Sequence, residues 1–331
     1  MPELPEVETV VRSLRPLLIG RRITGVEMPE NGPNGSARAR LRRILATPAK
    51  DFSRRLCGSR VTDVRRYGKN VLIELSPSQE EADVRCLLIH LGMTGRLVWE
   101  DTPETRSPHT HVVFALDAPG CWLHYTDIRR FGKLRLADPR GKELSKLGPD
   151  PLEIAREAFY ERLHSRRAMV KSLLLDQRFL RGIGNIYADE SLFRACIHPA
   201  AIAARLNRER ASRLYDGIRE TLTHAIELGG SSISDYVDAQ GRAGWFQLEH
   251  QVYRRTGEAC PQCGTLIRRM VIASRSTHFC PRCQRGPTRP GLRPVAIGRS
   301  TPNVAPRTRK GTASAVPKNR QQRGALAPEA R

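Results

Sequence analysis

The first turns of the chain carry apolar residues at the spacing of one helical face. Polar residues, among them Arg12 and Arg15, fall on another face. Pro16 and Gly20 are predicted to end or kink this helix. The pattern therefore predicts an amphipathic helix from Glu6 onward that fixes the amino-terminal end against a core. Its apolar positions are Val7, Val10, Val11, Leu14 and Leu18.

Short segments in which apolar and polar residues alternate follow this helix as far as residue 136. Turn residues separate them, which favours an antiparallel sandwich or barrel over alternating strands and helices. The Gly-, Pro- and Arg-rich stretch from Pro29 to Ser59 is predicted to be a surface loop with one helix around Ala39 to Leu45. The predicted strands are Ile23 to Met28, Val61 to Arg66, Val71 to Leu75, Cys86 to Leu91, Arg96 to Trp99, Val112 to Leu116, Trp122 to Tyr125 and Leu134 to Leu136.

Helical spacing replaces this alternation after the Gly-Pro-Asp-Pro stretch at residues 148–151. The polar, Gly-containing segment Ser231 to Gln247 is predicted to be a mobile loop. From Arg285 onward large apolar residues almost disappear, which predicts a disordered basic tail. We therefore expect parts at residues 1–148, 149–247, 248–286 and 287–331. The predicted helices are Ala155 to Ser165, Ala168 to Leu175, Ala188 to Arg194 and Asn207 to Leu228.

The charge of the chain changes the picture from a globular protein to one with a polyanionic partner. Its 56 Lys and Arg residues exceed its 34 acidic residues and give a net charge of +22. Such an excess favours nucleic acid ahead of a membrane surface. The sequence offers no apolar run long enough to span a membrane and no cleavable signal segment, so we expect a cytoplasmic protein without a membrane partner.

Two Cys-x-x-Cys pairs, separated by 16 residues, stand in the last third of the chain. Four thiolates at this spacing suit one structural zinc ion and leave no open coordination position, while iron in the same cage or a redox pair is the alternative. The segment between the pairs is predicted to be a β-hairpin with Arg268, Arg269 and Arg275 at its tip. The four predicted ligands are Cys260, Cys263, Cys280 and Cys283.

The opening residues Pro2 and Glu3 combine an amine and a carboxyl group. If Met1 is removed, Pro2 becomes an amino-terminal secondary amine, and such amines have a pKa of about 7.7 to 8.0. Condensation of this amine with an aldehyde-level carbon gives an iminium ion, and Glu3 beside it can transfer protons. The competing interpretation is that these residues only start a helix.

Other motifs combine cations with glycine or aromatic residues. The Gly-rich turn before Asn185 lets backbone amides approach a phosphate, although it also suits a tight turn between helices. Arg129 and Phe131, before a Gly, suit an enzyme that fills the space left by an extruded base, and Met93 is another candidate. Each of the two apolar side chains also suits a core position. Lys69 starts a predicted strand, where it can meet a phosphate or move a proton.

Taken in order, these motifs resemble bacterial formamidopyrimidine-DNA glycosylases from Met1 to Cys283. The resemblance is carried by PELPEVET, LGMTG, YTDIRRFG, RGIGNIYADE followed by IHP, GGSSISDYVDAQGRAGWFQ, and the two cysteine pairs. It implies an α+β fold, in which an N-terminal antiparallel β-sandwich with its N-terminal helix precedes a helix-two-turn-helix domain and a C-terminal zinc-ribbon β-hairpin. The implied enzyme is a bifunctional DNA glycosylase and AP lyase of base excision repair that removes 8-oxoguanine and formamidopyrimidines.

The resemblance also implies roles for individual residues. Pro2 is the nucleophile, Glu3 the general acid and base, Lys69 the residue of β-elimination and Arg275 that of δ-elimination. The implied phosphate-binding residues are His109, Arg129, Lys171 and Asn185, and the implied void-filling residues are Met93, Arg129 and Phe131. The implied partner is double-stranded DNA containing oxidised bases, bound by a monomer that carries one structural Zn²⁺ and works in the bacterial cytoplasm at the nucleoid.

Two other functions remain open at this point. An endonuclease VIII-like glycosylase shares these motifs but prefers oxidised pyrimidines, and that branch tends to have Gly where Leu4 stands. A non-catalytic zinc-ribbon protein that only binds damaged DNA is the second alternative.

Overall fold

The computed structural model describes residues 1–29, 37–76, 86–102, 107–118, 120–137, 144–232 and 236–286, without the side chains of residues 37–40. The predicted basic tail from residue 287 lies outside these ranges. Among the helices that are described, none has both the length and the apolar composition needed to cross a bilayer.

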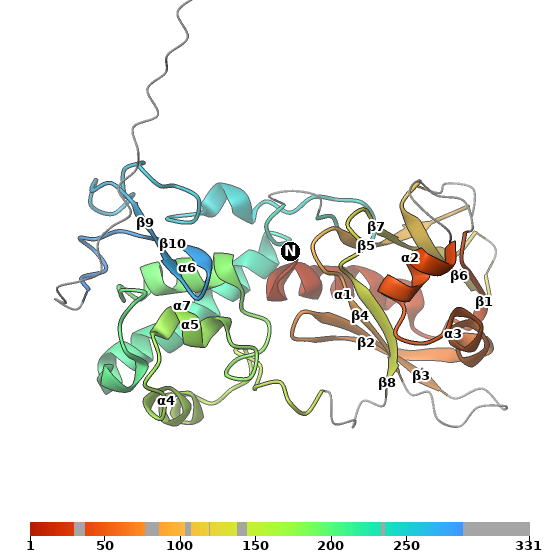
Figure 1. Cartoon of the computed structure of the whole chain (residues 1–331), viewed down its shortest axis with the longest axis horizontal. Helices are drawn as coiled ribbons and strands as arrows, with labels where there is room; N and C mark the ends of the chain where they lie inside the picture. The colour runs from red at the N-terminus through yellow and green to blue at the C-terminus, as the bar shows by residue number, and fades with distance from the viewer. Residues whose placement is uncertain are drawn as a thin grey trace, which may run out of the picture. The chain divides into compact units, whose positions relative to one another are not determined.

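Within the described ranges, the strands of the N-terminal part form two four-stranded antiparallel sheets, so the predicted antiparallel β-sandwich is confirmed (Figure 1). Every predicted strand is present to within two residues at each end. One sheet has the order β2 (Arg60–Tyr67), β3 (Asn70–Ser76), β4 (Cys86–His90), β8 (Lys133–Ala137). The other has the order β1 (Ile23–Glu27), β6 (Thr110–Leu116), β7 (Trp122–Asp127), β5 (Gly95–Glu100).

Helix α1 (Leu4–Leu18) contributes to two hydrophobic cores. Val7 and the apolar residues after it pack with both sheets, whereas Leu4 packs with the helices of the second part. The helix continues through Pro16 and ends at Leu18, just before Gly20, so Pro16 does not end it, whereas the predicted end at Gly20 is confirmed. Helix α1 therefore holds the amino-terminal end where the two cores meet (Figure 1).

The stretch between Pro29 and Ser59 is more ordered than the sequence predicted. Helices α2 (Ala37–Ile44) and α3 (Ala49–Leu56) occupy most of it. Ile44, Phe52 and Leu56 are fully buried in the core of the sandwich. The predicted helix around Ala39 to Leu45 is therefore confirmed by α2, whereas the prediction of a surface loop is wrong for α3, which two buried apolar side chains anchor to the core.

The second part is helical, as predicted, and it also packs around one core. Its helices are α4 (Arg156–His164), α5 (Val170–Leu175), α6 (Asn185–Arg194) and α7 (Arg208–Glu227), with short 3-10 turns η1 (Ala203–Arg205) and η2 (Phe246–Glu249). Helix α6 begins three residues before the predicted helix Ala188 to Arg194. This earlier start brings its first backbone N–H groups to the turn at Gly182 to Gly184, which positions the site described below.

The segment Ser231 to Gln247, which was predicted to be a mobile loop, packs against the N-terminal part. Tyr236 and Ala239 are buried among the core residues of the sandwich. The Trp99 N–H donates to the Ala239 carbonyl at 2.8 Å, and the Ala239 N–H donates to the Ser13 hydroxyl at 3.1 Å. The contacts of Tyr236 and Ala239 contradict the predicted mobile loop for these residues. Residues 233–235 lie outside the described ranges.

The third part contains the predicted β-hairpin, formed by β9 (Arg268–Ile272) and β10 (Arg275–Phe279). Ala273 and Ser274 form its two-residue turn with φ of 50° and 57°, as twisted hairpins require. The register pairs Arg275 with Ile272 at the tip, but it pairs Arg268 with Phe279 at the opposite end. The prediction that Arg268 and Arg269 lie at the tip is therefore wrong, and Arg275 is at the tip.

Candidate active site and zinc centre

Glu3 lies at the start of α1 and reaches the amino-terminal end of α6. Its carboxylate accepts hydrogen bonds from the backbone N–H groups of Ile186 (3.2 Å) and Tyr187 (3.5 Å), and the residue is 4% exposed. The amino-terminal end of a helix carries partial positive charge, which stabilises a carboxylate held there. The Leu4 N–H donates to the Gly182 carbonyl at 3.0 Å, so backbone and side chain fix α1 to the same turn.

Two glycines in this turn leave room for that contact. A Cβ atom on Gly184 would lie 2.2 Å from the Glu3 carboxyl carbon, and one on Gly182 would lie 2.9 Å from the Leu4 side chain. Gly182 also has a φ of +95°, which only glycine adopts without strain. The sequence predicted that these backbone amides approach a phosphate, but those of Ile186 and Tyr187 instead bind Glu3.

Glu6 is part of this site, although the sequence analysis missed it. Its carboxylate accepts hydrogen bonds from the Glu3 N–H (2.7 Å), the Ser231 N–H (2.7 Å) and the Tyr187 hydroxyl. Burial raises the pKa of Glu6, and the nearby charge of Glu3 raises it further. The signal was available, because a Glu three residues after the first helix-capping residue is typical of a capping box.

Lys69 lies in the tight turn between β2 and β3, and its side chain is almost fully buried. Burial lowers the pKa of the Lys69 ammonium group, Glu3 and Glu6 oppose this effect, and Arg275 reinforces it. Lys69, in the β2–β3 turn, is therefore within electrostatic reach of Glu3 and Glu6 at the start of α1 and of Arg275 on the zinc hairpin. A lowered pKa increases the fraction of neutral amine that can accept a proton.

A cavity of about 260 Å³ opens beside the amino-terminal end. Burial lowers the pKa of the amino-terminal ammonium group on Met1, so an amine at this place loses its proton more readily than in water. Charges on Glu3, Glu6, Lys69 and Arg129 also act on this amine. The cavity is lined by Met1, Pro2, Glu6, Met93, Thr94, Arg129, Ile186, Ser231, Tyr236, Tyr253 and Arg254.

The three predicted void-filling residues have exposed side chains. Met93 is 38% exposed and Phe131 is 51% exposed, so neither is a core residue. The guanidinium carbon of Arg129 lies 4.7 Å from the centre of the Phe131 ring, at cation–π distance. Met93 and Arg129 both line the cavity, which places two of the three residues beside the amino-terminal end.

The histidines at the start of β6 face different surroundings. His111 is buried, and its Nε2 atom lies 2.9 Å from the Asp127 carbonyl oxygen. His109 is partly exposed and precedes the strand. Of these two histidines, His109 is therefore the more accessible to an external ligand, and its contact with a phosphate stays a prediction.

Asn185 and Lys171 both bind the zinc hairpin from the helical part. The Asn185 amide donates to the Ser276 carbonyl at 3.0 Å, and the Lys171 ammonium donates to the same oxygen at 2.9 Å. Lys171 Nζ also lies 2.6 Å from Asp189 Oδ1, and both side chains are fully buried. Asp189 Oδ2 in turn accepts the His278 N–H at 2.9 Å. This burial does not fit the expectation that Lys171 contacts a DNA phosphate directly.

Replacing Lys171 tests this placement. We expect Lys171→Met to lower the free energy of unfolding by about 3–5 kcal/mol, because it leaves the Asp189 carboxylate buried without its ammonium partner. Chemical denaturation measures this change. The slope of DNA affinity against salt concentration should stay the same, whereas loss of an exposed phosphate contact lowers that slope by about one. Arg129→Met is the matched control and should lower the salt slope. A stable Lys171→Met protein with a reduced salt slope would show that Lys171 contacts a DNA phosphate directly.

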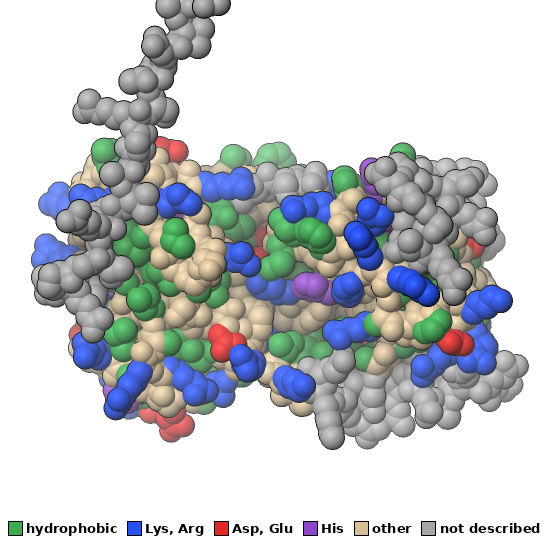
Figure 2. Space-filling view, viewed as in Figure 1, with side chains coloured by type: hydrophobic (Ala, Val, Ile, Leu, Met, Phe, Trp, Pro, Cys, Tyr) green, Lys and Arg blue, Asp and Glu red, His purple; other side chains and the backbone are tan. Residues whose placement is uncertain are grey.

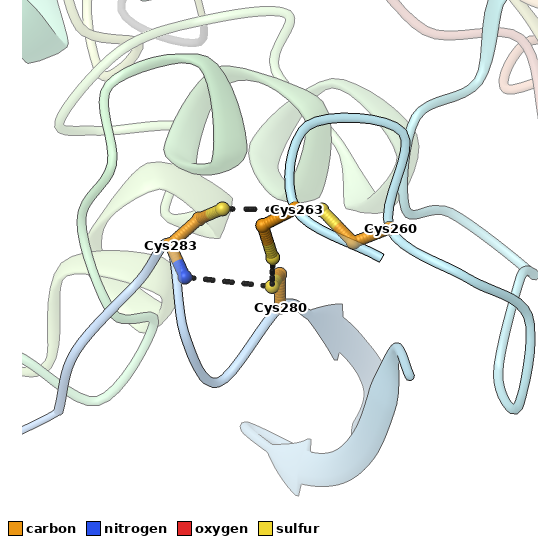
Figure 3. A group of neighbouring side chains, drawn as sticks. All are labelled: Cys260, Cys263, Cys280 and Cys283. Carbon is orange, nitrogen blue, oxygen red and sulfur yellow. Dashed lines mark hydrogen bonds between the residues drawn. The ribbon is translucent and has the colours of Figure 1, made fainter. Parts of the chain in front are cut away.

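The four cysteines of the third part form the predicted metal site (Figure 3). Their sulfur atoms all lie within 4.8 Å of one another, with 3.9 Å between Cys260 and Cys283 and 3.5 Å between Cys263 and Cys280. Tetrahedral zinc with Zn–S bonds of about 2.3 Å requires sulfur separations near 3.8 Å, whereas a disulfide requires about 2.0 Å. The cysteines therefore form the cage of one structural zinc ion, as predicted.

Contacts between the second and third parts fix the zinc module in place. Gln284 is fully buried, accepts the Cys280 N–H at 2.9 Å and donates to the Ile197 carbonyl at 2.9 Å. Phe193 of α6 packs against Cys260 and Cys280. The hairpin that carries the exposed Arg275 at its tip is therefore held by the zinc-binding cysteines and by their packing against α6.

Basic side chains occupy much of the face seen in Figure 2, and acidic ones occupy few places on it. Arg129 and Arg254 are exposed and line the cavity at the amino-terminal end, and Arg275 is exposed at the hairpin tip. The positive charge anticipated from composition is therefore present around the candidate site, where it favours a polyanion.

Family models match three successive parts of the chain. The formamidopyrimidine-DNA glycosylase N-terminal domain matches residues 1–134, and the H2TH domain of the same enzymes matches residues 147–237. The zinc finger found in FPG and IleRS matches residues 257–286. The order of the three matches is the one expected from the sequence motifs.

Individual proteins give the same result. A formamidopyrimidine-DNA glycosylase of Solibacter usitatus is 49% identical over 286 residues, which cover 86% of this chain and 100% of that protein. The crystal structure of the MutM (FPG) protein of Thermus thermophilus has a TM-score of 0.70 and 41% identity, with 86% of this chain and 100% of that chain covered.

A third protein was solved with its ligand. A Lactococcus lactis FPG mutant in complex with a Fapy-dG containing DNA has a TM-score of 0.74 and 34% identity, with the same two coverages of 86% and 100%. The sandwich, the helical part and the zinc module correspond in order to the three matched models. The chain belongs to the formamidopyrimidine-DNA glycosylase family.

Proposed function

We propose that this protein is a bifunctional DNA glycosylase and AP lyase of base excision repair that removes oxidised purines from double-stranded DNA. The observation that carries the proposal is the amino-terminal end at a cavity, with the Glu3 carboxylate fixed on α6 and with Lys69 acting electrostatically on the same amine. Family membership supports the same conclusion, because the Lactococcus lactis relative was solved with a Fapy-dG containing DNA.

The first step uses the amine and the carboxyl group. After removal of Met1, the Pro2 nitrogen attacks C1′ of the damaged nucleotide, and the bond from C1′ to the base breaks with its electron pair going to the base. The Glu3 carboxylate takes the proton from the Pro2 nitrogen and passes it to the ring oxygen as the bond from C1′ to that oxygen breaks, which leaves an iminium ion between Pro2 and C1′, while the released base takes a proton from water. Glu3 suits this role because the amino-terminal end of α6 holds its carboxylate in place and because it is the residue next to Pro2, which lines the cavity.

The iminium ion then permits two eliminations. It withdraws electrons from C1′, so a base can remove the proton at C2′ and expel the 3′ phosphate. The lowered pKa of Lys69 supports its role as this base. Arg275, exposed at the hairpin tip, is positioned to assist the second elimination, which expels the 5′ phosphate. The strand is then cut on both sides of the lesion.

The remaining site residues hold the DNA. We assign phosphate contacts to His109, Arg129 and Asn185, and the space of the extruded base to Met93, Arg129 and Phe131. Extrusion requires such fillers because unstacking otherwise leaves a hole in the duplex. Lys171 is assigned instead to holding the hairpin, since it is fully buried.

The organisation follows from these roles. We propose a catalytic part at residues 1–148, a DNA-binding part at 149–247, a zinc hairpin at 248–286 and an accessory tail at 287–331. The zinc ion supplies cross-linking of the hairpin rather than chemistry, because four thiolates fill its coordination. A monomer in the bacterial cytoplasm, associated with the nucleoid, fits an enzyme whose substrate is chromosomal DNA.

Lesion preference tests the proposed substrate. We expect excision of 8-oxoguanine opposite cytosine to exceed excision of thymine glycol, measured as base release from matched duplexes under single-turnover conditions. A duplex containing undamaged guanine is the control for non-specific release. Preference for thymine glycol would instead assign the protein an endonuclease VIII-like function.

A further inference from the structure

Asp127, at the end of β7, is fully buried and has hydrogen bonds to both carboxylate oxygens. Oδ1 accepts the Thr94 hydroxyl at 2.6 Å and the Arg129 N–H at 3.2 Å. Oδ2 accepts the Gly132 N–H at 2.8 Å and the Tyr125 hydroxyl at 3.2 Å. Two donors on each oxygen require a carboxylate, because an amide side chain offers only one oxygen and places an N–H group at the other position.

Three of these donors come from two loops that carry the void-filling residues, and the fourth, Tyr125, belongs to β7. We call Leu91 to Gly95, which carries Met93, and Ile128 to Gly132, which carries Arg129 and Phe131, the paired loops. Their backbones touch, since a Cβ atom on Gly92 would lie 2.5 Å from the Gly132 nitrogen. Asp127 itself pairs with Gly95 in the β5–β7 ladder, so its carboxylate lies at the base of both loops.

A second hydrogen bond makes the two loops depend on each other. Thr94 Oγ1 donates to Asp127 and also accepts the Arg129 N–H at 3.0 Å. The backbone from which the Arg129 side chain extends is therefore held by the loop that carries Met93. His111 adds to the arrangement, because its Nε2 atom lies 2.9 Å from the Asp127 carbonyl oxygen.

The tips of the paired loops are exposed even though their bases are buried. Phe131 and Ile128 are each 51% exposed, and Met93 is 38% exposed. Apolar tips without surrounding protein keep a fixed geometry only if their backbones are fixed, because burial does not immobilise them. The buried carboxylate supplies that constraint.

We propose that Asp127 is the positioning residue that holds the paired loops in one arrangement, so that Met93, Arg129 and Phe131 enter the duplex together. This inference rests on the proposed function, in which these residues replace the extruded base. Asp127 is buried beneath the loops and acts through them, not on the reacting atoms. Its loss should therefore impair extrusion of a base from a duplex and spare chemistry at a sugar that has no base to extrude.

The test compares two substrates. We expect Asp127→Asn to reduce excision of 8-oxoguanine from a duplex by about tenfold or more, since a buried donor loses its acceptor. Cleavage of a preformed abasic site in single-stranded DNA should stay within about twofold, because no base has to leave a stack. A 2-aminopurine next to the lesion should show a smaller fluorescence rise on binding, which reports extrusion directly. Asp63→Asn, on β2 away from the paired loops, is the matched control.

Two further variants cover the case in which Asp127→Asn does not fold. Thr94→Val removes the hydroxyl that joins the loops, and Thr94→Ser keeps it, so duplex excision should be higher for Ser than for Val. Equal excision by Asp127→Asn and the wild type, or by the two Thr94 variants, overturns the inference. Equal losses on both substrates by a folded variant also overturn it, because Asp127 then acts on the chemistry. If the wild type itself releases no base, the proposed function fails instead.

Discussion

A chain that keeps a short, uncleaved extension ahead of Pro2 is expected to form no borohydride-stable adduct with DNA that contains an abasic site. In this variant the Pro2 nitrogen is a tertiary amide, which cannot form an iminium ion. Base excision should fall below detection for the same reason. Gel electrophoresis of the reduced reaction measures the adduct, and intact-mass measurement of the wild type establishes that Met1 has been removed.

Two variants distinguish the role of the Pro2 amine from the roles of Glu3 and Lys69. Glu3→Gln keeps the amine, so it should still form the adduct at a preformed abasic site, while excision falls by about 10²–10⁴-fold through loss of the general acid. Lys69→Met removes a side-chain amine that acts electrostatically on the amino-terminal group, and should also keep the adduct. An adduct that persists in the extended chain and disappears in Lys69→Met would identify Lys69 as the nucleophile. Absence of an adduct from the wild type would leave only a DNA-binding protein.

Cys280→Ser is expected to abolish zinc binding and, with it, the ordered structure of the hairpin. Apparent zinc-binding free energies of about 10–16 kcal/mol drive folding of small zinc modules, so a missing ligand removes most of what holds this one. Because Arg275 and the carbonyl that binds Asn185 and Lys171 belong to the hairpin, DNA affinity should fall by about 10–100-fold through loss of charge-assisted contacts. Zinc content per chain and DNA affinity measure the two effects.

Cys196→Ser is the matched control, since Cys196 is an exposed cysteine outside the cluster. It should keep one zinc ion per chain and unchanged affinity. A chelator should reproduce the Cys280→Ser phenotype in the wild type, with recovery when zinc is added back. Full DNA affinity in metal-free protein would mean that the hairpin folds without its ion.

The sheets could be predicted from the sequence because each strand alternates between a shared core and its other face. Leu72, for example, faces a small separate cluster, while its neighbours Val71 and Ile73 face the main core. Helix α3 escaped prediction because Phe52 and Leu56 are its only buried residues among those described, and two apolar residues within eight set no clear period. The prediction that Pro16 ends α1 failed because Pro16 lies in the last turn, where only two further helical residues follow it and little of the helix is disturbed.

The site was predictable where a residue type carries its own chemistry. The cysteine spacing alone indicated the zinc ligands, whereas the assignment of Pro2 as the nucleophile stays a prediction. Lys171 could not be interpreted correctly, because a lysine in a sequence does not show whether an Asp such as Asp189 is buried beside it. Asp127 left no signal at all, since its four donors come from backbone and hydroxyl groups brought together only by the fold.

The contact between Glu3 and α6 joins residues 183 positions apart in the chain, and Glu6 also binds the Ser231 N–H from 225 positions away. During synthesis, the amino-terminal end leaves the ribosome long before these partners exist. The Glu3 carboxylate is therefore positioned only when most of the chain has been made and folded. A nascent or truncated chain that ends before α6 and Ser231 thus lacks the partners that fix Glu3 and Glu6 beside the amino-terminal end.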